Sequence, residues 1–98
     1  MSKTKAINKI KSNNGFREIK RREYNGNMET TFVFDLPTAN NIEKIIDNIN
    51  LYNTTCNLIT NILKENNVNY KFVNQGMGLL QFANGFGIEY TVDFPMTI

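Results

Sequence analysis

The 98-residue sequence contains no histidine, no tryptophan and only one cysteine. Without histidine the chain cannot form a Ser-His-Asp triad, a Cys-His pair or a metal site with imidazole ligands. The lone Cys56 cannot form an internal disulfide, which excludes a disulfide-stapled secreted scaffold and favours a reducing compartment. No catalytic, cofactor-binding or metal-binding motif remains. We therefore expect a protein that is not an enzyme and that uses no cofactor or metal ion.

Long apolar runs are missing as well. No stretch approaches the roughly 18–20 consecutive apolar residues that a membrane-spanning helix needs. The basic N-terminus is followed by Asn13, Asn14 and Gly15, where a signal peptide would need its apolar segment. These absences predict a cytoplasmic protein with no membrane partner.

The composition that is present is typical of one small globular domain, which we expect to span residues 1–98. The chain is 41% hydrophobic and 20% charged, which is unlike a disordered segment. Its charges are unevenly distributed: residues 1–24 carry a net charge of +6, whereas residues 25–98 carry −4. We expect residues 1–14 to form a flexible arm or a short basic helix.

Residues 16–24 and 28–36 read as two strands of a hairpin. They flank Asn25-Gly26, a dipeptide that favours a type I′ turn because both central residues of that turn need a positive φ. The second segment is rich in aromatic and β-branched residues that alternate with period two. The first alternates poorly and carries charges of both signs, which fits an edge strand. A helix over the first segment is the alternative interpretation.

The clearest pattern in the chain lies in residues 40–65. Apolar residues recur there at steps of three and four, and two extra isoleucines widen the stripe. The stripe consists of Ile42, Ile45, Ile46, Ile49, Tyr52, Cys56, Ile59, Ile62 and Leu63. It predicts an amphipathic helix of about 25 residues that packs on a sheet, or two helices broken near residues 52–57. Asn40 followed by Glu43 resembles a capping box at the start of the helix.

The C-terminal third returns to strand-like patterns. Residues 68–73 and 88–94 alternate, residues 79–83 form a short apolar run, and residues 74–78, with sequence NQGMG, read as a loop. The predicted element order is (α)ββαβββ. We therefore expect a two-layer α+β fold, with one long amphipathic helix packed on an antiparallel sheet of about four to five strands.

The basic segment 16–24 is the first candidate for a binding surface. Lys and Arg neutralise phosphates in nucleic-acid complexes, and aromatic side chains there stack on bases. The notable alternatives are a solvated edge strand, in which Glu18 and Glu23 pair with neighbouring basic residues, and docking onto an acidic protein surface. A second candidate is the methionine between two glycines at 76 and 78. The partner-binding candidates are Arg17, Lys20, Arg21, Arg22, Tyr24 and Met77.

Taken alone, the sequence predicts a small non-enzymatic binding protein that acts through a protein–protein surface. Its many Asn, Ile and Lys residues have AT-rich codons, a composition that suits an accessory protein of a phage or mobile element, including an inhibitor of host machinery. An RNA- or DNA-binding module that uses residues 3–24 is the alternative. A homodimer joined through the 40–65 helix or a sheet edge is a third hypothesis.

Overall fold

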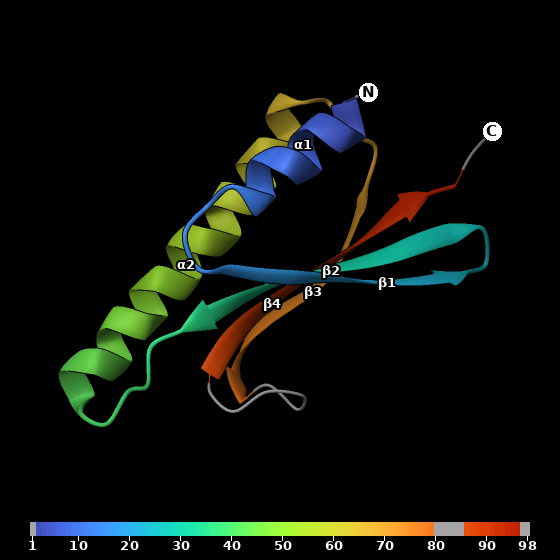
Figure 1. Cartoon of the computed structure of the whole chain (residues 1–98). Helices are drawn as coiled ribbons and strands as arrows, with labels where there is room; N and C mark the ends of the chain where they lie inside the picture. The colour runs from blue at the N-terminus through green and yellow to red at the C-terminus, as the bar shows by residue number, and fades with distance from the viewer. Residues whose placement is uncertain (1, 80–85, 97–98) are drawn as a thin grey trace.

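The computed structural model describes residues 2–79 and 86–96, and in these ranges it is an α+β fold. The four strands form one sheet in the order β1-β2-β4-β3, and every neighbouring pair is antiparallel. Both helices lie on the same face of this sheet (Figure 1). The elements are α1 (Ser2–Lys11), β1 (Phe16–Tyr24), β2 (Asn27–Leu36), α2 (Ile42–Glu65), β3 (Lys71–Leu79) and β4 (Phe86–Pro95). The predicted α+β architecture with one long helix on an antiparallel sheet is confirmed.

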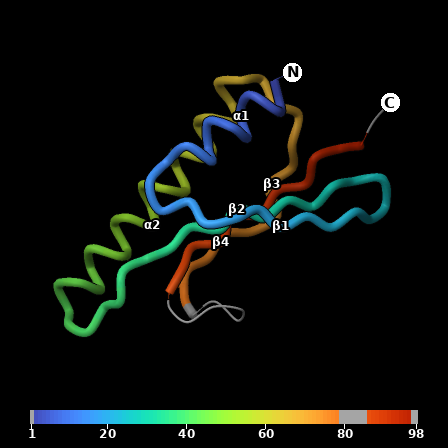
Figure 2. Tube along the Cα trace, in the orientation of Figure 1, coloured from blue at the N-terminus to red at the C-terminus, as the bar shows by residue number. Residues whose placement is uncertain are grey.

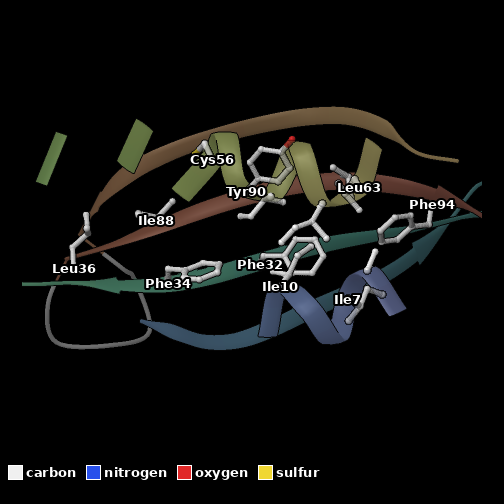
Figure 3. Packing of buried hydrophobic residues seen from close by; sticks show 14 residues of the cluster. Ile7, Ile10, Phe32, Phe34, Leu36, Cys56, Leu63, Ile88, Tyr90 and Phe94 are labelled. Carbon is white, nitrogen blue, oxygen red and sulfur yellow. The ribbon is translucent and has the colours of Figure 1, made fainter. Parts of the chain in front are cut away.

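The core lies between the two helices and the sheet. Phe32 of β2 and Tyr90 of β4 sit near its centre, and Ile10 reaches it from α1 (Figure 3). The buried Tyr90 hydroxyl lies 2.6 Å from Thr60 Oγ1 of α2, so this phenol is hydrogen-bonded inside the core. The buried apolar cluster contains Ala6, Ile7, Ile10, Phe32, Phe34, Leu36, Cys56, Ile59, Ile62, Leu63, Ile88, Tyr90, Val92 and Phe94.

The first hairpin forms as its sequence predicts. Asn25 and Gly26 have φ values of 49° and 76°, the left-handed conformation that a type I′ turn requires. Strand β1 is an edge of the sheet. Its pairing with β2 shifts by one residue between Phe16 and Glu18, so a bulge at Arg17 resets which side chains share a face.

Strand β3 differs from the expectation at residues 74–78. The predicted loop NQGMG lies inside β3 and pairs with β4, with Gly76 opposite Glu89. Glycine disfavours strands on its own, but backbone pairing with a neighbouring strand overrides that weak preference. The predicted separate strand at 79–83 lies outside the described residues except for Leu79, the last residue of β3. Within the described part of the chain, the sheet has four strands.

Helix α2 is a single uninterrupted helix, which answers the question of one helix or two. Its N-cap is Asn41, one residue later than the capping box predicted. Asn41 is extended, and its side chain accepts a hydrogen bond of 2.9 Å from the backbone N–H of Lys44. Glu43 therefore lies in the first turn, one position before the place that a capping box needs. The helix runs beyond the sheet at its N-terminal end (Figures 1 and 2).

Candidate binding surfaces

The cations of β1 face carboxylates of the neighbouring strand. Arg17 Nη1 donates a hydrogen bond of 2.9 Å to Asp35 Oδ1. Arg22 Nη2 lies 3.5 Å from the carboxylate oxygens of Glu29, the residue directly opposite it on β2. These contacts hold the two guanidinium groups against the acidic part of the same chain. As exposed pairs they contribute little to stability, on the order of 0–1 kcal/mol each.

Tyr24 also has a partner inside the molecule. Its hydroxyl donates a hydrogen bond of 3.0 Å to Asp93 Oδ2, and this bond raises the pKa of the phenol above its ordinary value. Arg22 lies over the Tyr24 ring, 5.1 Å from its centroid. Asp93 is buried, and its Oδ1 atom has no hydrogen-bond partner within residues 2–79 and 86–96. Tyr24 therefore supports a buried carboxylate, and its ring is already stacked.

The predicted candidates of β1 are divided between two faces of the sheet. Lys20 and Arg22 lie opposite Thr31 and Glu29, on the face without helices, whereas Arg21 lies opposite Thr30 on the helix face. The helix-free face carries charges of both signs in close balance. Its cations are Arg17, Lys20, Arg22 and Lys71, and its carboxylates are Glu18, Glu29, Asp35, Glu89 and Asp93. The mixture of signs differs from the predominantly positive surface that is typical of proteins that bind a nucleic-acid backbone.

Positive charge without compensation lies instead on α1. This helix has four lysines and no acidic residue, and the first carboxylate in the chain is Glu18. The ammonium of Lys3 lies 5.2 Å from the centroid of the Phe94 ring, in a cation–π contact. In the described ranges no carboxylate lies within 4 Å of an α1 ammonium. We name Lys3, Lys5, Lys9 and Lys11 the α1 lysine surface.

The apolar stripe of α2 is buried only in its C-terminal half. Ile59 and Leu63 are fully buried in the core. In the N-terminal half the exposed fractions are 74% for Ile42, 45% for Ile45, 50% for Ile46 and 44% for Ile49. These four residues, which we name the isoleucine surface, lie where α2 extends past the sheet (Figure 1). The expectation that the whole stripe packs on the sheet is therefore wrong for this half.

Element lengths account for little of this exposure. A helix of 24 residues is ~36 Å long, and strands of nine or ten residues span ~30–33 Å. The difference is about one helical turn or less, whereas the exposed isoleucines occupy eight residues. The exposure therefore depends on how the helix crosses the sheet, which the sequence pattern does not show.

The edge strand β3 exposes apolar side chains too. Phe72, Val73 and Met77 are exposed by 47%, 37% and 39%. Met77 lies opposite Ile88 and so shares the helix side of the sheet. A hydrogen bond of 3.1 Å from Gln75 Nε2 to the Tyr52 hydroxyl joins β3 to α2. The predicted candidate Met77 thus lies on a strand next to α2, far in sequence from the other candidates on β1.

Comparison with protein-family models and with curated protein sequences found no match. Within the described ranges, neither helix is long and apolar enough to cross a membrane.

Proposed function

We propose that this chain is a non-enzymatic binding protein whose contact with its partner is the isoleucine surface. The observation that carries the proposal is the exposure of four isoleucines on one side of an overhanging helix end. Contiguous exposed apolar patches on small proteins commonly mark interaction sites. A single exposed isoleucine would need no explanation, but four within eight residues do.

The free energy gained by burying the isoleucine surface supports a binding role. The four exposures add up to about two fully exposed isoleucine side chains. Burying that much apolar surface contributes roughly 3–6 kcal/mol, at ~1.5–3 kcal/mol for each side chain. A small domain has a total stability of only ~5–15 kcal/mol. A partner that covers this surface therefore gains a driving force comparable with that of folding.

This proposal moves the contact away from most of the residues that the sequence suggested. Arg17, Arg22 and Tyr24 already contact Asp35, Glu29 and Asp93. Met77 remains, because it lies on the strand beside α2. The role of an accessory protein that inhibits host machinery stays a prediction from composition.

The test compares two kinds of exposed position on α2. Ile46→Asn and Ile49→Asn change the isoleucine surface. Leu51→Asn makes a matched change at a residue with 42% exposure that lies on another side of the helix. We expect the tagged wild-type chain and Leu51→Asn to capture the same proteins from cells of the source organism, and both isoleucine variants to lose them. Circular dichroism checks that all variants remain folded.

If the captured set is the same for wild type, both isoleucine variants and Leu51→Asn, the contact does not involve the isoleucine surface. That result would contradict the proposed binding mode.

Nucleic-acid binding is the second candidate function, and the α1 lysine surface is the observation that favours it. Four cations without neighbouring carboxylates can neutralise phosphates, and affinity should then fall steeply with salt. We expect Lys5→Gln and Lys9→Gln each to reduce the log–log salt slope by about 0.7–0.9, whereas Lys71→Gln on the opposite face leaves it unchanged. A mobility shift that is absent at low salt would exclude this function.

A further inference from the structure

The isoleucine surface and the edge of β3 lie on the same side of the molecule. Ile45, Ile49 and Tyr52 follow helical steps of four and three and so share one side of α2. The Tyr52 hydroxyl bonds Gln75 of β3, which identifies that side as the one facing β3. Figure 3 agrees, because α2 runs along the side of β4 and β3 while α1 lies on the side of β2 and β1. The two features thus form one continuous surface.

The two edges of the sheet differ in how well they are protected from pairing with another strand. Strand β1 has six charged residues among nine, whereas β3 has only Lys71. Charged side chains on an edge strand discourage pairing with another chain. A register shift between Phe72 and Asn74 interrupts the start of β3, and Asn74–Leu79 then continues as an uncharged strand. This stretch presents outward backbone groups to an incoming strand.

The edge of β3 lacks a covering helix, and the isoleucine surface lacks a strand beneath it. Phe72 and Met77 are exposed on the helix side of β3, where a helix would cover them. The isoleucine surface extends past the sheet, where a further strand would cover it. A fifth strand added to β3 would lie beneath the overhanging part of α2, and its apolar side chains would meet the isoleucines. Strand addition of this kind is a known mode of protein recognition.

We propose that this fifth strand is β3 of a second copy of the chain, paired antiparallel about a two-fold axis. Such a contact is self-complementary, because each copy offers both the exposed strand and the overhanging helix. The isoleucine surface of each copy then covers Phe72 and Met77 of its partner. The antiparallel arrangement places the two Lys71 residues at opposite ends of the pair, so no like charges meet. The result is one continuous sheet across the dimer.

The area of this contact reaches what a specific interface needs. Strand β3 is ~30 Å long, and a sheet with one helix layer packed on it is ~20 Å thick. Their product is ~600 Å² per copy, or ~1,200 Å² in total, just above the ~1,000 Å² that separates specific interfaces from chance contacts. The helix segment Ile42–Ile49 alone offers only ~12 Å by ~10 Å. The isoleucines therefore need β3 to complete an interface.

This inference rests on the proposed function, since it names the partner of the same surface. Its test is sedimentation equilibrium of the full chain over a wide concentration range. We expect a mass that rises from 11.3 kDa toward twice that value. Met77→Lys, which places a charge on the edge, and Ile46→Asn should each weaken the dimer by about tenfold or more. Leu51→Asn should leave it unchanged.

Engineered cysteines locate the contact. Asn74→Cys or Gly76→Cys, whichever lies nearer the two-fold axis, should form a disulfide-linked dimer under mild oxidation, whereas Arg21→Cys on the β1 edge should not. A side chain at Gly76 meets nothing within 4 Å, so this variant should fold. The native Cys56 does not interfere, because burial raises its pKa to about 11 and keeps it a thiol at neutral pH.

Three results would overturn the inference. A monomer at every concentration up to millimolar excludes the dimer. A dimer that Met77→Lys leaves unchanged uses another surface, and so does one that cross-links best through Arg21→Cys. If the chain is monomeric but captures a different protein in an Ile46-dependent manner, the partner is not a second copy, and the proposed function is still supported. A monomer without any Ile46-dependent capture contradicts both.

Discussion

The two halves of α2 have the same apolar periodicity and opposite environments. In the C-terminal half, Ile59 and Leu63 are fully buried against the sheet and α1, whereas in the N-terminal half Ile42 is 74% exposed. The periodicity of a helix thus shows which side is apolar, but it does not show what covers that side. The cover depends on how the helix crosses the sheet beneath it, which is set by other segments.

Different interactions hold the two halves in place. The C-terminal half is anchored by core packing and by the hydrogen bond between Thr60 and Tyr90. The N-terminal half has the Asn41 cap, together with Asn48 Nδ2, which donates a hydrogen bond of 2.8 Å to the carbonyl of Pro37. We therefore expect the N-terminal half to be the less stable part of the helix.

The largest expected difference between the halves is in the cost of shortening an isoleucine. Ile59→Ala should lower the free energy of unfolding by about 2–5 kcal/mol, because it leaves a cavity in the core. Ile45→Ala should change it by less than about 0.5 kcal/mol in dilute solution, because Ile45 is half exposed. Urea denaturation measures both values. Equal losses would mean that the N-terminal half is buried like the C-terminal half.

Thiol reactivity tests the same difference in burial between the two halves of α2. Burial raises the pKa of Cys56 to about 11, whereas an exposed thiol such as that of Ile46→Cys keeps the ordinary pKa of about 9.0. At pH 8 the thiolate fraction, and with it the alkylation rate, should be about 100-fold lower for Cys56. Both thiols should react equally in urea, which is the control. Fast labelling of Cys56 in the folded protein would contradict its burial.

The raised pKa of Cys56 also predicts the direction in which stability changes with pH. The folded protein holds the thiol proton more tightly than the unfolded chain, whose thiol has a pKa near 9.0. Stability is therefore complete below pH 9 and falls as the pH rises from 9 toward 11. Cys56→Ala should reduce the loss of stability in this window, measured by urea denaturation at each pH. An unchanged loss would assign the pH dependence to other groups.

Much of the fold could be predicted from local patterns. The Asn25-Gly26 turn, the alternation along β4 and the apolar period of α2 each depend on neighbouring residues, and each forms as expected. The strand through NQGMG could not be predicted, because its pairing with β4 outweighs the low strand preference of its glycines. Strand formation there is decided by a partner that local sequence does not contain.

The candidate surface was harder to predict for a similar reason. The interpretation of β1 as a binding surface stays a prediction, and the sequence alone did not reveal that the register places Arg22 opposite Glu29 or that a bulge lets Arg17 reach Asp35. Register is set by the hairpin and the core, so charge counts along the sequence do not reveal it. The exposure of the isoleucines likewise depends on where the sheet ends.

A smaller effect is expected from the hydrogen bond that anchors the C-terminal half. Thr60→Val keeps the shape of the side chain but removes the partner of the Tyr90 hydroxyl. The free energy of unfolding should fall by about 1–2 kcal/mol, because a buried hydroxyl loses its bond. Thermal or urea denaturation measures the change. Tyr90→Phe in the Thr60→Val background should recover part of the loss, and a further loss instead would mean that the phenol has another partner.

The smallest expected effect is confined to the N-terminal half. Asn41→Ala removes the side chain that accepts the Lys44 N–H and should destabilise the start of α2 by about 0.5–1 kcal/mol. Hydrogen exchange should quicken by about two- to fivefold in the first turns of the helix and stay unchanged around Ile59, since ~1 kcal/mol corresponds to about a fivefold change in an opening equilibrium. Asn40→Ala is the matched control at the position that the sequence pattern favoured. A larger effect from Asn40→Ala would show that Asn40 is the N-cap. Faster exchange around Ile59 would show that the two halves of α2 open together.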